Sequence, residues 1–208
     1  MKMVLAAVPG AGKSTVMHLI QKELPEINIV TLGDFMYNIA KKDYGIHDRD
    51  EMRKKLSPTG YRDVQERAAT NISQLTGDVL IDTHLSIKTS FGYYPGLPDD
   101  LVRLIQPDVI VLLEFEPKIV LNRRKKDIEL NNEKTTLIGT VVKPRAGREL
   151  ENLEDIDHQQ QLNRYFAVAA ANAARCSVKI IDLRFEQHIP FEHAQTAAKE
   201  LIALFKNK

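Results

Sequence analysis

The residues best suited to chemistry lie near the start of the chain, in the segment AVPGAGKS at positions 7–14. A short apolar run at 3–6 precedes this segment, and a segment expected to be helical follows it over 14–24. Strand, glycine-rich turn, lysine, hydroxyl residue and helix, in that order, are typical of a phosphate-binding P-loop. Glycines let backbone N–H groups approach phosphate oxygens, and the start of the helix adds favourable partial charge. The segment therefore predicts a site for a nucleoside triphosphate.

Three residues of this segment carry expectations of their own. Lys13 is a compact cation that can reach the β- and γ-phosphates, and the Ser14 hydroxyl can bind Mg²⁺. Ala7 stands where the usual pattern has its first glycine, and its methyl group narrows the allowed backbone geometry without abolishing the loop. The alternative is a chance glycine turn before a core helix, which the surrounding strand and helix disfavour.

A second part of the site is expected where the strand at 79–82 ends in a carboxylate, Asp82. In P-loop proteins this position often holds a group that orients Mg²⁺, although an Asp there can instead cap the next loop. The loop at 83–89 then leads to the segment GYYPGLP at 92–98, a stiff aromatic loop that could hold a flat base. An ordinary surface turn is the alternative, but ligands of α/β sheets bind beyond the carboxyl ends of strands, which favours a binding role.

Basic residues gather in three places after the P-loop: at Arg53, at 123–126 and around 145–164. Transfer of a phosphoryl group between two anions needs cations around both substrates, because the transition state spreads charge over three oxygens. Residues 128–155 lose the helical periodicity and contain an apolar patch at 137–142 that could form a small hairpin. We expect an inserted lid at 128–155, which would close and keep water from the γ-phosphate.

The elements that must position these residues alternate along the chain. Apolar segments expected as strands lie at 3–6, 27–31, 79–82, 109–113 and 178–182. Segments expected as helices lie at 14–24, 34–42, 48–56, 61–75, 117–127, 157–175 and 191–205. This alternation predicts an α/β domain with a three-layer P-loop NTPase fold and a five-stranded parallel sheet. Right-handed crossovers would bring the P-loop and the ends of the third and fourth strands to one rim.

Some helix details are also predicted. Asp34 is placed to cap the helix that continues to Lys42. Apart from Arg53, the charges at 48–56 are expected to form a solvated helix. The long helix at 157–175 is expected to bury a stripe of Leu162, Phe166, Ala169, Ala170 and Ala173. His158, His188 and His193 lack metal-ligand spacing and are expected to be ordinary helix and loop residues.

Composition sets further limits. A net charge of +1 over 208 residues gives no global field that would recruit nucleic acid or a membrane surface. The only cysteine is Cys176, which excludes a disulfide framework and a multi-cysteine zinc site. No apolar run approaches the ~20 residues of a membrane span, and no signal peptide is recognised, so we expect a cytoplasmic protein.

With these residues in view, the chain resembles the archaeal-type adenylate kinases, a family of P-loop nucleoside monophosphate kinases. The matching segments span nearly the whole chain in the same order: VPGAGKST at 8–15, GDFM at 33–36, DRDEMRK at 48–54, IDTH at 81–84, GYYPGLP at 92–98 and NRY at 163–165. The resemblance implies the reversible reaction MgATP + AMP ⇌ MgADP + ADP and a homotrimeric assembly. It divides the chain into a core (1–31, 77–127, 156–208), an AMP-binding helical insertion (32–76) and a lid (128–155).

The resemblance also implies roles for particular residues. ATP would be held by Pro9, Gly10, Ala11, Gly12, Lys13, Ser14 and Thr15. AMP would contact Asp34, Arg53, His84, Lys88, Thr89, Tyr94 and Gly96. Ser14 would bind Mg²⁺ directly and Asp82 through water, while Lys13, Arg123 and Arg164 would act on the transferred phosphoryl group, joined by Arg145 or Arg148.

The chain departs from the family at a few positions. Lys88 stands where many adenylate kinases have an arginine, and Leu32 and Tyr37 replace a threonine and an arginine of bacterial relatives. Arg53 is therefore expected to supply the missing cation near Gly33 and Asp34. Two alternatives stay open: a kinase for CMP, UMP, dAMP or a non-nucleotide acceptor, and a P-loop ATPase or switch that drives a protein partner.

Overall fold

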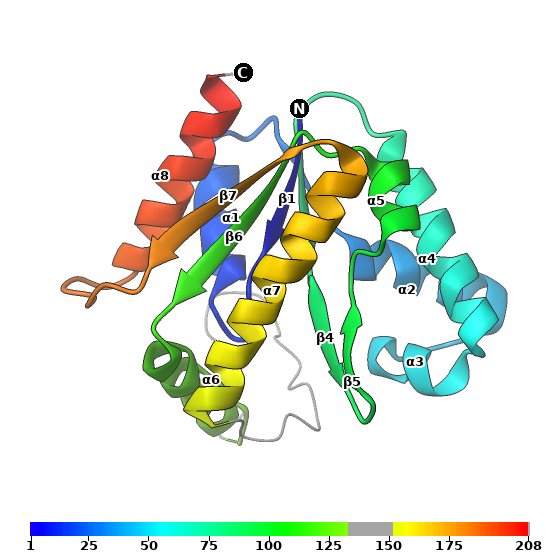
Figure 1. Cartoon of the computed structure of the whole chain (residues 1–208), viewed down its shortest axis with the longest axis horizontal. Helices are drawn as coiled ribbons and strands as arrows, with labels where there is room; N and C mark the ends of the chain where they lie inside the picture. Colours follow the sequence, from blue (N-terminus) through cyan, green and yellow to red (C-terminus); the bar gives the residue numbers. More distant parts are fainter. Residues whose placement is uncertain (133–151, 208) are drawn as a thin grey trace.

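The central feature is a five-stranded parallel sheet with the strand order β2-β3-β1-β6-β7. The computed structural model describes residues 1–132 and 152–207 (Figure 1). The strands of the sheet are β1 (Lys2–Ala6), β2 (Asn28–Thr31), β3 (Val79–Thr83), β6 (Val109–Phe115) and β7 (Ser177–Leu183). The predicted fold class and all five predicted strands are thus confirmed, with ends shifted by one to two residues.

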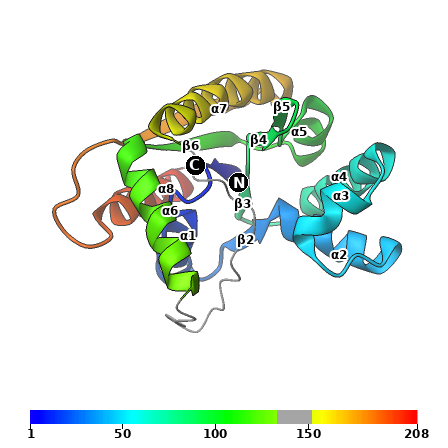
Figure 2. The same cartoon turned by 90° about the horizontal axis from the view of Figure 1, so that it is seen from below.

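Helices cover both faces of this sheet. They are α1 (Lys13–Glu23), α2 (Leu32–Tyr44), α3 (Met52–Lys55), α4 (Pro58–Ser73), α5 (Asp99–Ile105), α6 (Pro117–Asn132), α7 (Leu153–Ala174) and α8 (Glu192–Lys206), with a 3₁₀ turn η1 (Arg49–Glu51) before α3. Figure 2 shows α7 on one side of the sheet, α1 and α8 on the other, and α2, α3 and α4 gathered as a group beside β2. No helix within the described ranges is both long and apolar enough to cross a membrane.

Two hydrophobic cores lie on the two faces of the sheet. All seven residues of β6 are buried, as expected for a central strand, and their side chains alternate between the cores. Ile110 and Leu112 pack into the core under α7, whereas Val111, Leu113 and Phe115 pack into the core under α1 and α8. Because β3 and β6 flank β1 in parallel, their carboxyl ends lie on either side of the P-loop, as predicted.

Several local predictions were wrong. Asp34 does not cap α2, because the helix begins two residues earlier and Asp34 lies in its first turn. The segment at 48–56 forms a short 3₁₀ turn and one turn of helix rather than a long charged helix. Residues 86–95, expected to be loop, pair as the antiparallel hairpin β4 (Ser86–Thr89) and β5 (Gly92–Pro95). Gly92 adopts φ +107° directly after the two-residue turn, a conformation that favours glycine.

The buried face of helix α7 matches the predicted stripe only in part: Ala170 is buried, and Phe166 and Ala173 pack against the core while partly buried. Its buried residues are Ile156, Gln159, Gln160, Asn163, Ala167, Ala170 and Ala171, whereas Ala169 is exposed and Leu162 and Phe166 are only partly buried. The three polar members have long-range partners. Asn163 accepts a hydrogen bond from the Ser86 hydroxyl at 2.7 Å, and Gln159 donates to the same hydroxyl at 3.4 Å. Gln160 bonds both backbone groups of Phe115 at 2.8 and 2.9 Å. These bonds fasten α7 to β4 and to the end of β6. The possible hairpin at 137–142 and Arg145 and Arg148 lie outside the described residues.

Candidate active site

The P-loop connects β1 to α1 at the centre of the sheet's carboxyl rim. Gly10 and Gly12 have φ angles of +80° and +91°, in the left-handed region where a side chain causes strain. Gly12 is the N-cap of α1, and no side chain of the described residues caps this helix end. The first N–H groups of α1 therefore remain available to an anion, as phosphate binding at a helix start requires. Ala7 is buried and is accommodated in this loop.

Lys13 and Asp82, predicted from separate motifs, lie in direct contact. The Lys13 ammonium is 2.6 Å from Oδ1 of Asp82 and donates to the backbone carbonyl of Thr83 at 2.7 Å. Ser14 follows on the exposed surface at the start of α1. A hydroxyl and a carboxylate are the hard oxygen donors that Mg²⁺ prefers, so these two residues fit a magnesium ion that arrives with a nucleotide.

Two consecutive arginines of α6 donate hydrogen bonds to backbone carbonyls of the P-loop. Arg123 donates to the carbonyl of Ala11 at 2.6 Å, and Arg124 donates to the carbonyl of Pro9 at 2.8 Å. A Cβ atom on Gly10 would lie 2.7 Å from Cγ of Arg124, so this glycine is needed for the close approach of the arginine. Arg123 was predicted as a site residue, whereas Arg124, which is 7% exposed, was not.

The guanidinium of Arg123 is held by neutral groups. Besides the Ala11 carbonyl, it lies 4.9 Å from the centre of the Phe115 ring, and its Nη2 atom is 3.1 Å from Nδ1 of His193. Burial lowers the pKa of Arg123 from its usual value, and the nearby carboxylate of Asp127 opposes the shift. An arginine stays charged at neutral pH even so. Arg123 therefore presents a cation next to the phosphate-binding loop.

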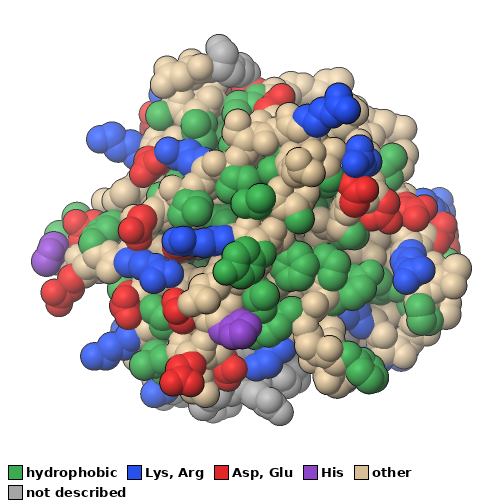
Figure 3. Space-filling view, in the orientation of Figure 1, with side chains coloured by type: hydrophobic (Ala, Val, Ile, Leu, Met, Phe, Trp, Pro, Cys, Tyr) green, Lys and Arg blue, Asp and Glu red, His purple; other side chains and the backbone are tan. Residues whose placement is uncertain are grey.

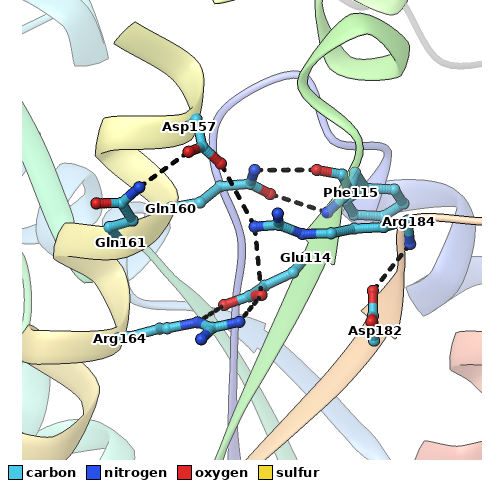
Figure 4. Close-up of polar contacts among 8 residues, drawn as sticks. All are labelled: Glu114, Phe115, Asp157, Gln160, Gln161, Arg164, Asp182 and Arg184. Carbon is cyan, nitrogen blue, oxygen red and sulfur yellow. Dashed lines mark hydrogen bonds and ion pairs between the residues drawn. The ribbon is translucent and has the colours of Figure 1, made fainter. Parts of the chain in front are cut away.

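Arg164 lies in a different setting (Figure 4). Its Nε and Nη2 atoms each lie 2.5 Å from a carboxylate oxygen of Glu114, whose side chain is only 3% exposed. Arg184, which follows β7, approaches the same carboxylate at 3.6 Å and Asp157 at 3.5 Å. The hydrogen bond to Glu114 raises the pKa of Arg164. The contacts of Arg164 in the structure are thus with Glu114 at the end of β6, on the face that α7 covers, and not with the P-loop.

On the acceptor side, an unpredicted arginine covers the start of α2. Arg49 forms an ion pair with Asp34 at 2.5 Å. A Cβ atom on Gly33 would lie 1.9 Å from Nη2 of Arg49, so the arginine side chain rests directly against the helix at this glycine. Arg53, expected to supply this cation, instead donates to the Tyr61 hydroxyl at 3.1 Å.

The remaining predicted acceptor residues lie on or next to the β4–β5 hairpin. Gly96 lies against His84, because a Cβ atom on Gly96 would be 1.9 Å from the carbonyl oxygen of His84. Tyr94 is 38% exposed. Lys88 reaches Asp155 of α7 at 3.7 Å, and Thr89 closes the turn by donating to the Gly92 carbonyl at 2.8 Å. The structure therefore brings His84 and Gly96 together at the base of the hairpin and leaves Lys88 and Thr89 towards its tip.

Known proteins similar to this chain include a family of AAA domains and several archaeal adenylate kinases. Residues 6–138 match the family described as an AAA domain. The chain is 48% identical to the adenylate kinase of Pyrobaculum aerophilum over 98% of its own length and 96% of the relative. It is 38% identical to the adenylate kinase of Thermoplasma acidophilum over 87% of this chain and 88% of that one. With the Thermoplasma volcanium enzyme it shares 34% identity over 99% and 100% of the two chains.

Solved structures share the fold. A shikimate kinase from Bacteroides thetaiotaomicron superposes with a TM-score of 0.59 and 14% identity, covering 99% of this chain and 98% of that chain. A shikimate kinase from Acinetobacter baumannii superposes with a TM-score of 0.52, also at 14% identity, over 100% and 94% of the two chains. At such low identity the likeness concerns the architecture of the sheet and helices alone.

Proposed function

This chain belongs to the adenylate kinase family, and on that premise we propose how its own residues transfer a phosphoryl group. As a nucleoside monophosphate kinase, it converts MgATP and AMP to MgADP and ADP, reversibly. The feature of the structure that supports this function is the P-loop, around which Lys13, Asp82 and Arg123 are assembled. The direct test is whether ADP forms from MgATP only when AMP is supplied.

The donor side of the reaction uses the P-loop. Residues 9–15 surround the ATP phosphates and donate to them from the backbone N–H groups of 10–15, and Lys13 leaves Asp82 and the Thr83 carbonyl to reach the β- and γ-phosphates. Asp82 and Ser14 would then hold the Mg²⁺ that accompanies the nucleotide. When bound, this ion neutralises charge on the β- and γ-phosphate oxygens. Asp82, which would lose its ion pair when Lys13 moves, would then interact with the bound Mg²⁺ through water.

The transfer step needs no general base. The attacking group is a phosphate oxygen of AMP, which is already anionic at neutral pH, so positioning and charge neutralisation perform the catalysis. Arg123 contributes a fixed cation beside the P-loop. Arg164 joins it by moving from Glu114 to the transferred phosphoryl when both nucleotides are bound and the lid at 128–155 excludes water.

We propose that AMP binds between α2, α3 and the β4–β5 hairpin. We assign Asp34, Arg53, His84, Lys88, Thr89, Tyr94 and Gly96 to this acceptor pocket, and we add Arg49 because it lies against Gly33 and Asp34. The AMP phosphate would draw Arg49 and Arg53 from Asp34 and Tyr61, since a dianion attracts a guanidinium more strongly than either present partner.

Substitution of Arg53 tests this pocket. Arg53→Ala is expected to raise the KM for AMP about ten- to a hundredfold, because a hydrogen bond to a charged group contributes about 1.5–3 kcal/mol. The KM for ATP should change far less. Arg103→Ala removes another exposed arginine, one that pairs with Asp99 on α5, and it serves as the control for loss of one positive charge. Equal effects of Arg53→Ala on both substrates would place Arg53 outside the acceptor pocket.

An exposed apolar face supports a homo-oligomer, and we propose a trimer as the resemblance implies. Tyr165 and Val168 on the outer face of α7 are 70% and 61% exposed, and Ile180 on the edge strand β7 is 41% exposed. Hydrophobic side chains gather across the middle of this face of the molecule (Figure 3). An exposed apolar helix face beside an unpaired strand edge is the kind of surface that oligomers cover.

Introducing charge on this face tests the assembly. Tyr165→Glu combined with Val168→Glu is expected to convert a trimer to monomers at micromolar concentration, because burying two carboxylates in an apolar interface is strongly unfavourable. Gln195→Glu on the exposed face of α8 is the control for added negative charge. Sedimentation velocity of the three proteins gives the result. A monomeric parent protein, or a trimeric double variant, would contradict the assignment of this face.

A further inference from the structure

His193 joins the start of α8 to the arginine beside the P-loop. The side chain is 1% exposed, and its Nε2 atom lies 2.8 Å from the carbonyl oxygen of Phe185. Its Nδ1 atom lies 3.1 Å from Nη2 of Arg123. The ring is also enclosed by the aromatic rings of Phe185, at 4.6 Å between centres, and Phe115, at 5.8 Å. One imidazole therefore connects α6, the segment after β7 and α8.

The hydrogen bonds fix which nitrogen of His193 carries the proton. A backbone carbonyl can only accept, so Nε2 carries the hydrogen and donates it to Phe185. Nδ1 of the neutral ring is then an acceptor, and the Arg123 guanidinium donates to it. The Gln187 atom that lies 3.0 Å from the same nitrogen is Oε1, which can only accept, so with this tautomer the Gln187 amide is turned to bring its NH₂ group to the ring. The imidazole is thus set to receive hydrogen bonds on the side of Arg123.

Three uncharged groups orient the Arg123 guanidinium, while the nearby carboxylate of Asp127 balances part of its charge. A carboxylate would fix a guanidinium equally well but would compete with phosphate for the same cation, as Glu114 does for Arg164. An imidazole nitrogen, the Ala11 carbonyl and the Phe115 ring are uncharged. A guanidinium has five N–H groups, so donors remain for a phosphate after these two hydrogen bonds. Such an arrangement removes the cost of ordering a long side chain during the reaction.

We propose that His193 is a positioning residue for phosphoryl transfer, and that its Nδ1 atom holds the Arg123 guanidinium in place over the P-loop. The proposal rests on the proposed role of Arg123 at the transferred phosphoryl. We do not expect His193 itself to contact a nucleotide. It acts by keeping Arg123 aligned on the P-loop before ATP arrives, so its loss should affect the use of ATP and not the binding of AMP.

Two substitutions separate the two nitrogens of the ring. His193→Asn places an amide near the position of Nδ1, keeping an acceptor for Arg123 but losing the bond to Phe185. His193→Gln places an amide near Nε2, keeping the bond to Phe185 but losing the acceptor. We expect His193→Gln to lower kcat/KM for ATP at least about tenfold with the KM for AMP within about twofold of the parent, and His193→Asn to remain within about threefold in both. Melting temperatures measured in parallel report the structural cost of each change.

The test is completed by measuring the two His193 substitutions again in an Arg123→Ala background. There His193→Gln should cause no further loss, because the group that it positions is absent. Two results would overturn the proposal. In the first, His193→Gln keeps a parent-like kcat/KM for ATP although Arg123→Ala is strongly impaired. In the second, His193→Asn and His193→Gln lose kcat/KM equally, and the losses follow the decrease in melting temperature. A parent-like Arg123→Ala would instead contradict the role of Arg123 in the proposed function.

Discussion

Lys13→Ala is expected to lower turnover by at least ~10³-fold while the protein stays folded. Loss of one preorganised charge at a transferring phosphoryl group costs roughly 10²–10³ in rate, and Lys13 is expected to contact both the β- and the γ-phosphate. Steady-state ADP formation from saturating MgATP and AMP gives the comparison. Lys22→Ala, in the last turn of the same helix, is the matched control and should leave turnover unchanged.

The same substitution has a predictable structural cost. Asp82 is 18% exposed and loses its cation in Lys13→Ala, which should lower the free energy of unfolding by about 1–3 kcal/mol. Adding Asp82→Asn removes the unpaired charge and should restore most of this stability without restoring turnover. Turnover of Lys13→Ala within tenfold of the parent would contradict the assigned role of Lys13.

Arg164→Ala is expected to reduce both stability and turnover, for separable reasons. Removal of the bidentate partner leaves the buried carboxylate of Glu114 with Arg184 at 3.6 Å, which should cost about 3 kcal/mol or more in unfolding free energy. Such a loss lowers the melting temperature by about 6–12 °C for a chain of this size. Loss of a cation from the transition state should lower kcat by about 10² or more.

The double variant Glu114→Gln with Arg164→Ala distinguishes the two effects. Removing the stranded charge should recover much of the melting temperature, whereas kcat should stay low. Arg184→Ala is the matched control, because it removes the other arginine of Glu114 and should reduce stability with little change in kcat. A double variant with parent-like turnover would show that Arg164 acts only through Glu114.

The sequence predicted those features whose signal is local. Each central strand is an apolar run between turn residues, and the P-loop is a contiguous motif, so both were found. The hairpin at 86–95 was missed because its glycine and proline content favoured a loop, whereas pairing of Ile87 with Tyr94 stabilises strands. The buried face of α7 was predicted only in part because Gln159, Gln160 and Asn163 are polar and periodicity counts only apolar residues.

The missed site residues depend on contacts between distant parts of the chain. Arg124 was part of a basic run that normally faces solvent, and only its approach to Gly10 and Pro9 assigns it to the P-loop. Arg49 has its role because α2 and the turn η1 fold against each other. His193 lacks any motif, and its contacts with Phe185 and Arg123 arise only when α6 and α8 meet. A pattern in a single sequence does not show which distant residues come into contact, so these roles could not be predicted.

As an adenylate kinase, this chain transfers a phosphoryl group from MgATP to AMP. The most direct measurement is the rate of ADP formation from MgATP with AMP, CMP, UMP, GMP or no acceptor, at matched concentrations. We expect fast ADP production with AMP, two ADP for each ATP consumed, and little production with the other monophosphates or without an acceptor. A rate that does not depend on any monophosphate would contradict this function and would identify an ATPase on the same fold.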